Sequence, residues 1–162
     1  MGGQAMYKIR VIWVGRTQEK YLQEGIAVYL KKLSPYVRLE CEEIKPADYA
    51  KGHAQQWKMQ ETQGLLKKIQ PGETTVFLDE YGTQHTSLEF AQWLDQQKTM
   101  QVSRINFVMG GAYGMALSQP PAQSSFLSLS AMTLNHQMVR LIFLEQLYRA
   151  FTILHGEPYH HV

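Results

Sequence analysis

The sequence predicts an α/β fold in which one domain holds a mostly parallel sheet flanked by helices. Segments rich in β-branched residues alternate along the chain with segments of helical periodicity, which is the pattern of a parallel sheet with crossover helices. A length of 162 residues with 44% hydrophobic and 19% charged residues is enough for one buried core. We expect residues 6–162 to form this domain and residues 1–5 to be an N-terminal extension, disordered or non-native.

The first half of the chain is expected to supply two strands and two helices. The β-branched run at residues 7–14 ends at Gly15, and the helical periodicity that follows it stops at Ser34–Pro35. A second strand leads into a polar stretch before the next helix. The expected elements are a strand at 7–14, a helix at 19–33, a strand at 37–44 and a helix that ends near Ile69.

The second half begins after the turn signal Pro71–Gly72 and repeats the alternation. Ser87 is expected to cap the third helix and Asn135 to cap the last one. Residues 79–82 are expected to form a loop. The expected elements are strands at 74–78, 104–109 and 126–129, and helices at 87–97 and 137–155.

Three of the expected loops leave strands at their carboxyl ends, after Leu78, Met109 and Leu129. Ligands of open α/β sheets bind at this edge. The loop at Gly110–Gly111 lets a ligand approach the backbone, although its spacing is not that of a dinucleotide fingerprint and an ordinary glycine turn stays open. The loop at Leu129–Leu134 offers amides and hydroxyls beside apolar groups, which suits an adenosine-like ligand, or simply the approach to the last helix.

The final helix is apolar around most of its circumference, so it must be covered on more than one side. The sheet can cover one side, and a second copy of the chain in a two-fold dimer is the simplest cover for the other. His136 and Arg140 stand four residues apart and can face a phosphate or an anionic base. Glu145 and Arg149 share a face at the same spacing, and a structural ion pair is the plainer interpretation.

The C-terminal tail carries a phenol and two imidazoles at Tyr159, His160 and His161. This concentration of titratable groups suggests chemistry, and a frayed terminus is the alternative. No spacing of histidines with Cys41 supports a metal site, and a single cysteine cannot form an internal disulfide.

Composition excludes several classes of function. A net charge of +2 implies no general polyanion-binding surface, although a local basic patch is compatible with it. No uninterrupted apolar run long enough for a membrane span occurs, and the N-terminus lacks the pattern of a signal peptide. We therefore expect a cytoplasmic protein that contacts no membrane.

Three motifs closely resemble the RlmH family of bacterial large-subunit rRNA methyltransferases, the small single-domain members of the SPOUT superfamily. They are residues 107–114, residues 127–136, and Tyr148-Arg149-Ala150 together with Gly156-Glu-Pro-Tyr-His-His161. The likeness covers nearly the whole chain from Tyr7. It implies a sheet with a C-terminal trefoil knot, a feature that periodicity cannot show.

The resemblance also implies S-adenosylmethionine as methyl donor and N3 of a pseudouridine in 23S rRNA as acceptor, in the stem-loop that meets the decoding site. The partners would be this RNA, in the large subunit or the assembled ribosome, and a second copy of the chain; no metal is implied. The implied cofactor contacts are Leu78, Gly110, Gly111, Leu129, Ser130, Ala131, Met132, Thr133 and Leu134. The residues expected near the acceptor are Arg149, Tyr159 and His160 as catalytic groups and His136, Arg140 and His161 as substrate contacts.

Two other functions stay open at this stage. A different SPOUT enzyme that methylates tRNA would be favoured by a large appended RNA-binding domain, and a non-catalytic ribosome-binding module would be favoured by failure to bind S-adenosylmethionine. N3 of a uracil-like base must lose its proton before it attacks. A tail histidine can take that proton or an arginine can stabilise the anion, and the sequence does not separate these options.

Overall fold

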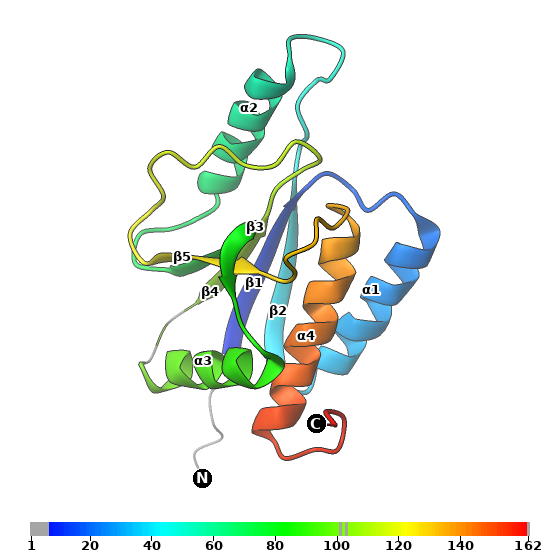
Figure 1. Ribbon diagram of the computed structural model, residues 1–162, viewed down its shortest axis with the longest axis vertical. Coiled ribbons are helices and arrows are strands. Elements are labelled where there is room, and N and C mark those ends of the chain that lie inside the picture. Colours follow the sequence, from blue (N-terminus) through cyan, green and yellow to red (C-terminus); the bar gives the residue numbers. More distant parts are fainter. Residues whose placement is uncertain (1–6, 101, 103, 162) are drawn as a thin grey trace.

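A computed structural model describes residues 7–100, 102 and 104–161 of the chain, and the predicted extension at residues 1–5 lies outside them. Strands and helices alternate as the sequence predicts (Figure 1). In chain order the elements are β1 (Tyr7–Val14), α1 (Lys20–Leu33), β2 (Val37–Ile44), α2 (Ala54–Leu66), β3 (Thr74–Gln84), α3 (Ser87–Thr99), β4 (Ile105–Met109), β5 (Ser124–Ser128) and α4 (Met138–Leu154).

The five strands form one parallel sheet in the order β2-β1-β4-β3-β5. The central strand β4 is buried along its whole length, and β1 is buried from Ile9 onward, which explains their nearly continuous apolar and β-branched sequences. The predicted α/β class with a mostly parallel sheet is confirmed. The trefoil knot stays a prediction, because strand order and register do not define how the chain threads.

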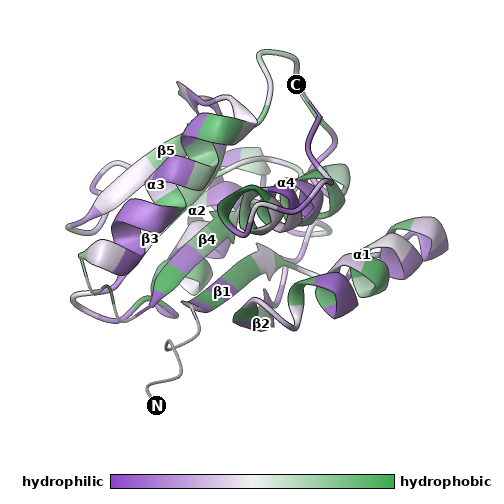
Figure 2. Ribbon diagram, turned by 90° about the horizontal axis from the view of Figure 1, so that it is seen from below, coloured by the Kyte–Doolittle hydropathy of each residue, from purple (hydrophilic) through white to green (hydrophobic). Residues whose placement is uncertain are grey.

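Helices cover both faces of the sheet. On one face α4 lies between α1 and α3 and contacts both, and the side chains of these three helices join β1, β3 and β4 in the larger core cluster (Figure 2). On the other face α2 contributes Leu65 to a smaller cluster with Ile12, Phe77 and Val108. No helix in the described part of the chain is long and apolar enough to cross a membrane.

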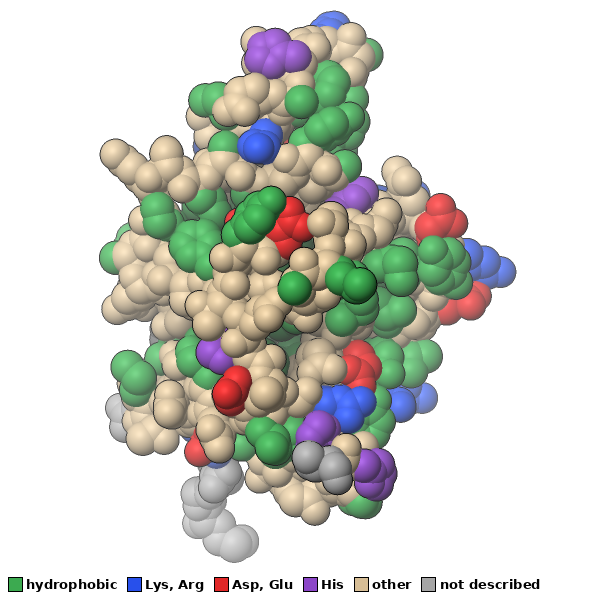
Figure 3. Space-filling model, viewed as in Figure 1, with side chains coloured by type: hydrophobic (Ala, Val, Ile, Leu, Met, Phe, Trp, Pro, Cys, Tyr) green, Lys and Arg blue, Asp and Glu red, His purple; other side chains and the backbone are tan. Residues whose placement is uncertain are grey.

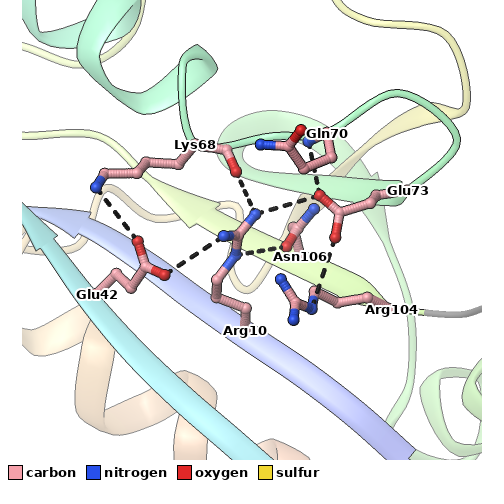
Figure 4. Close-up of polar contacts among 7 residues, drawn as sticks. All are labelled: Arg10, Glu42, Lys68, Gln70, Glu73, Arg104 and Asn106. Carbon is pink, nitrogen blue, oxygen red and sulfur yellow. Dashed lines mark hydrogen bonds and ion pairs between the residues drawn. The ribbon is translucent and has the colours of Figure 1, made fainter.

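A buried charge network joins the amino-terminal part of the sheet to the turn that follows α2 (Figure 4). Arg10 donates from Nε to Asn106 Oδ1 over 3.0 Å and lies 3.3 Å from Glu73 Oε1. Arg10 Nη2 also donates to the backbone carbonyl of Lys68, and Arg10 Nη1 lies 3.4 Å from Glu42 Oε1 on β2. Because Arg10 is 6% exposed, these partners are what allow a guanidinium inside the protein.

Strand β3 continues through residues 79–82, where the sequence predicts a loop. Its pairing with β5 shifts register between Leu78 and Thr83, so the strand bulges instead of ending. Gly82 makes this possible, since a Cβ at that position would lie 2.7 Å from the backbone carbon of Phe126. The prediction of a loop here is wrong. Tyr81–Gly82 has the composition of a turn, but Gly82 lies in a strand and allows β3 to approach the backbone of β5 closely.

Two helix caps differ from the predicted ones. Thr86, not Ser87, caps α3, in a capping box where Thr86 Oγ1 accepts from the backbone N of Glu89 over 3.1 Å. Helix α4 begins at Met138, after Gln137. Asn135 nevertheless serves the same end, because its Oδ1 accepts from the backbone N of Gln137 over 2.9 Å and of Met138 over 3.3 Å.

Candidate functional site

A pocket of about 740 Å³ opens at the carboxyl edge of the sheet, where β3, β4 and β5 end. The three predicted loops form its walls, together with the start of α4. Of the predicted cofactor residues, Leu78, Gly110, Gly111, Leu129, Ser130, Met132, Thr133 and Leu134 line the pocket, whereas Ala131 is exposed and does not. The structure thus brings residues more than 50 positions apart in the sequence into one cavity.

Glycines set the shape of the wall after β4. A Cβ at Gly110 would lie 2.8 Å from Met115 Cγ and 3.1 Å from the backbone carbon of Gly114. A Cβ at Gly111 would lie 2.7 Å from Glu61 Oε1. Gly114 has φ of +82°, and its N donates to the carbonyl of Gly111 over 3.0 Å. Glycine at positions 110, 111 and 114 therefore allows this loop to fold tightly at the edge of the cavity.

The loop after β5 is held by its own hydroxyls and by the bulge of β3. Ser128 Oγ donates to the carbonyl of Ser130 over 2.8 Å, and Ser130 Oγ accepts from the backbone N of Met132 over 2.9 Å. Thr133 Oγ1 donates to Glu80 Oε2 over 2.6 Å, which links this loop to β3. The cavity therefore offers backbone polar groups and hydroxyls beside apolar side chains, the mixture that a ligand with apolar and polar parts needs.

His136 lines the same pocket at the approach to α4. Partial burial lowers the pKa of its imidazole, and the nearby charge of Arg140 lowers it further, while Glu61 acts in the opposite direction. The ring is therefore neutral at neutral pH, so it can both donate and accept a hydrogen bond inside the cavity.

Arg140 does not face the pocket. Its side chain is fully buried, and Nη2 donates to the carbonyl of Val14 over 2.6 Å while Nη1 donates to the carbonyl of Gly15 over 3.0 Å and to Thr17 Oγ1 over 2.9 Å. The guanidinium carbon lies 4.8 Å from the ring centre of Trp13, and burial lowers the pKa of Arg140 to about 10. Against the expectation that it meets a phosphate, it fastens α4 to the end of β1.

The predicted catalytic residues form a cluster at the other end of α4. Arg149 Nη2 donates to Glu145 Oε1 over 2.6 Å, and Arg149 Nη1 lies 3.1 Å from His160 Nδ1. Tyr159 donates its hydroxyl to the same Glu145 oxygen over 3.0 Å, and its ring lies 4.7 Å from the Arg149 guanidinium carbon. Arg149, Tyr159 and His160 thus meet, and His161 is exposed beside them.

The tail that carries these groups is folded back onto the protein. The ring of Tyr159 packs edge-on against Tyr148 at 4.8 Å. The hydroxyl of Tyr36 donates to Glu157 over 2.6 Å, and this bond is the main reason that the pKa of Tyr36 rises to about 12. A frayed terminus, the alternative at the sequence level, does not describe residues 156–161.

Hydrogen-bond geometry fixes the chemical character of the tail cluster. A guanidinium only donates, so His160 Nδ1 accepts and the proton of the neutral ring is on Nε2. Burial, followed by hydrogen bonds with Tyr29 and Glu145, raises the pKa of Tyr159, which keeps the phenol neutral. The hydrogen bond to Glu145 raises the pKa of Arg149. The cluster therefore combines the guanidinium of Arg149, paired with the carboxylate of Glu145, with the hydrogen-bond donors of Tyr159 and His160.

Sequence reasoning missed two further residues of these sites. Glu145 was expected only as an ion-pair partner, yet it also holds Tyr159. Glu61, 1% exposed on α2, lies behind Gly111 and accepts from the backbone N of Ala47 over 3.0 Å and from the hydroxyl of Tyr49. The i, i+4 spacing marked Glu145, but no signal marked Glu61, whose role depends on contacts with distant segments.

The loop that leads into α4 lies at one end of this helix, and the C-terminal tail folds back near its other end (Figure 1). None of Glu145, Arg149, Tyr159 and His160 lines the pocket. Val139, in the first turn of the helix, lines the pocket, whereas Arg149 follows ten residues later. At 1.5 Å per residue this places the two about 15 Å apart along the helix axis. Within one chain, the tail cluster therefore does not border the pocket. Nowhere in the described residues do three or more His, Cys, Asp or Glu side chains gather as a metal site would need.

Comparison with known proteins agrees with this architecture. The family model described as "Predicted SPOUT methyltransferase" matches residues 7–160. The chain is 43% identical over 155 residues to a protein of Parabacteroides distasonis, covering 95% of this chain and 99% of the relative. It is 42% identical over 154 residues to one from Geobacter metallireducens, with the same coverage, and both relatives are named ribosomal RNA large subunit methyltransferase H. The chain therefore belongs to the SPOUT methyltransferase family.

Proposed function

We propose that this protein transfers a methyl group from S-adenosylmethionine to N3 of a pseudouridine in 23S rRNA, in the stem-loop near the decoding site. The observation that carries the proposal is the pocket, in which three loops from β3, β4 and β5 converge on one cavity of about 740 Å³. The names of the relatives at 42–43% identity support an RNA substrate in the large subunit. With a ribosomal substrate, we propose a cytoplasmic location.

The pocket residues fit S-adenosylmethionine by size and by chemistry. Gly110 and Gly111 line the pocket, and a side chain at either position would displace Met115, Gly114 or Glu61, so this wall of the pocket depends on the tight glycine turn. Residues 129–134 supply backbone amides and the hydroxyls of Ser130 and Thr133, and Leu78 and Leu129 supply apolar contact. The cofactor, when bound, would supply a methyl group on a sulfonium sulfur. A nucleophile bonds to the methyl carbon, and the sulfur leaves as a neutral thioether.

The tail cluster is proposed to act on the RNA base. N3 of the base carries a weakly acidic proton, and the anion left when it departs is the nucleophile. Arg149 and the Nε2–H of His160 are donors that can stabilise this anion, and the neutral hydroxyl of Tyr159 fixes Glu145 beside them. Because His160 Nδ1 is already occupied by Arg149, we favour anion stabilisation with the proton leaving to water over abstraction by His160.

Two copies of the chain are proposed to build each complete site. The tail cluster and the pocket of one chain lie at opposite ends of α4, so two antiparallel α4 helices would bring the tail of one copy beside the pocket of the other. Exposed apolar side chains on α1 and α4 provide the surface for this contact, with Tyr21 61%, Val28 50% and Met138 41% exposed. Figure 3 shows hydrophobic side chains gathered over these two helices.

Two measurements test the proposal. Mass spectrometry of rRNA from cells that lack the protein should show the unmethylated pseudouridine, and re-expression should restore the methyl group. Calorimetry should show S-adenosylmethionine binding to the wild type and loss of that binding in Gly110→Val, because the added side chain meets Met115 and Gly114. Methylation that appears only in tRNA would favour the alternative RNA substrate. A wild type that binds no cofactor would favour a non-catalytic ribosome-binding module.

A further inference from the structure

The segment between β2 and the middle of α2, residues 45–60, extends beyond the carboxyl edge of the sheet (Figure 1). We call it the arm. It holds three lysines, Lys45, Lys51 and Lys58, and a single acidic residue, Asp48, although the whole chain is nearly neutral. Lys45 and Lys51 are exposed, and Figure 3 shows basic and histidine side chains at this end of the molecule. Positive charge is therefore concentrated locally on a surface that the cores do not use.

Three aromatic rings cluster where the arm meets the loop after β4, residues 110–114. The ring centres of Tyr49 and Trp57 are 5.2 Å apart, those of Trp57 and Tyr113 5.0 Å, and those of Tyr49 and Tyr113 5.4 Å. Tyr49 and Tyr113 are each 42% exposed, so the cluster is not a closed core. Two of its polar atoms have partners within the protein, since Trp57 Nε1 donates to the carbonyl of Lys51 over 2.6 Å and Tyr49 donates to Glu61. The cluster thus exposes Tyr49, on the segment that carries the lysines, and Tyr113, on the loop that this segment meets.

This surface is continuous with the pocket, because Tyr113 and Lys58 both line it. We propose that the arm is an RNA-docking surface that holds unpaired nucleotides next to the methylated one, with phosphates on Lys45 and Lys51 and a base against the exposed rings. Stacking on aromatic rings combined with phosphate contact to lysine is how proteins bind single-stranded RNA. The inference rests on the proposed function and adds a recognition surface to it.

The lysines are tested with Lys45→Ala/Lys51→Ala, neither of which lines the pocket. The matched control is Lys8→Ala/Arg38→Ala, which removes two exposed charges from paired positions at the amino-terminal ends of β1 and β2, the opposite edge of the sheet. With ribosomes from cells that lack the protein as substrate, the arm variant should show a KM raised roughly fivefold or more, with an unchanged kcat. The salt dependence of its log KM should weaken by roughly 0.7 for each lost phosphate contact. The control should match the wild type in both quantities.

The rings are tested with Tyr113→Ala and Tyr113→Phe. Affinity for large-subunit rRNA, measured without cofactor, should fall roughly fivefold to a hundredfold in Tyr113→Ala and stay near the wild-type value in Tyr113→Phe. Cofactor affinity is measured separately, since Tyr113 also lines the pocket. Unchanged RNA affinity in Tyr113→Ala would overturn the stacking role, whatever the cofactor result.

The measurements separate failure of the docking surface from failure of the proposed function. If the wild type does not methylate rRNA, the proposed function is wrong. If the wild type methylates rRNA and the lysine variant has the KM and salt dependence of the wild type, only the docking surface is wrong. A lysine variant that sediments as a monomer where the wild type is a dimer would also overturn it, because the arm would then be a contact between copies. Matching circular dichroism spectra establish that the variants are folded.

Discussion

Glu145 shows how one carboxylate can arrange a group of tail residues. Its Oε1 accepts from Arg149 over 2.6 Å and from Tyr159 over 3.0 Å, and Arg149 in turn reaches His160. The ion pair with Arg149 that the i, i+4 spacing predicts is confirmed. A partly exposed pair of this kind contributes little stability, whereas the shared oxygen fixes the directions of two donors, Arg149 and Tyr159. The value of Glu145 is therefore in orientation.

We predict that Arg149→Ala lowers kcat for rRNA methylation roughly a hundredfold, the usual cost of removing a donor to a developing anion. Cofactor affinity should be unchanged, because Arg149 is not among the residues that line the pocket and is proposed to contact the RNA base. Single-turnover methyl transfer and calorimetry measure the two quantities. Arg149→Lys, which keeps the charge and loses the paired contacts, should fall in between, and equal activity of all three proteins would contradict the role.

His136 gives a prediction on pH. Burial lowers the pKa of its imidazole below the usual 6.5, so the unfolded chain binds a proton before the folded protein does. The contribution of His136 to stability is therefore complete above about pH 6.5 and is lost as the pH falls toward the folded pKa. Urea unfolding across this range should show a steeper loss for the wild type than for His136→Gln. Parallel pH profiles would show that the imidazole titrates alike in both states.

At the scale of elements, α4 is fastened at its start by a charged side chain inside the protein. Arg140 satisfies the carbonyls of Val14 and Gly15 and the hydroxyl of Thr17, where β1 ends. Removing it would leave buried acceptors without donors. The contact also positions His136, one turn earlier, at the pocket.

We predict that Arg140→Met lowers the free energy of unfolding by roughly 2–4 kcal/mol, the combined cost of the acceptors left without donors. Arg149→Met, at the half-buried end of the same helix, is the matched control and should cost less than about 1 kcal/mol. Urea denaturation measures both. A fully stable Arg140→Met with weaker RNA binding would instead assign Arg140 to the substrate.

The sequence predicts elements best where local chemistry determines them. The bounds of β1 and β2 agree with the predicted ones, because β-branched runs end there at Gly15 and begin after Pro35. The extension of β3 was missed since its residues look like a turn and only the neighbouring strand explains Gly82. Helical spacing placed Arg140 and His136 on one face but could not tell that the end of β1 covers Arg140. The glycine motif predicted the pocket, whereas no local signal predicted that Glu61 of α2 supports the loop from behind Gly111.

For the whole molecule, the decisive relation is between the two ends of α4. The pocket and the tail cluster share no residue, and Arg149 in the cluster lies about 15 Å along the helix axis from Val139 in the pocket. If catalysis needs both, a second chain must bring them together. The resemblance to a known family suggested the residues, and only the structure shows this separation.

We predict that deletion of residues 159–162 abolishes methyl transfer and leaves cofactor affinity and dimerisation nearly unchanged. Residues 159–161 belong to neither core cluster, and their contacts with Glu145, Tyr148 and Arg149 are only partly buried, so their loss should lower the melting temperature only slightly. Calorimetry, sedimentation and a methylation assay separate these effects. Full activity of the truncated protein would assign the chemistry elsewhere.

Mixing two inactive proteins tests the shared site directly. A Gly110→Val chain should have a damaged pocket and an intact tail, and a chain without residues 159–162 should have an intact pocket and no tail. After joint refolding, about half of random dimers are mixed and each has one intact site, so we predict about a quarter of wild-type activity. Neither protein alone should be active, and a mixture that stays inactive despite proven mixed dimers would mean that pocket and tail serve within one chain.

The position of the tail at the far end of α4 also bears on how the amount of protein in a cell sets its output. When chains are scarce, the number of complete sites would grow with the square of chain concentration, because two chains must meet for each pair of sites. A modest change in the rate at which the protein is made would then produce a proportionally larger change in the modification of newly made ribosomes. A cell that makes fewer ribosomes and fewer chains during slow growth would leave a larger share of them unmodified.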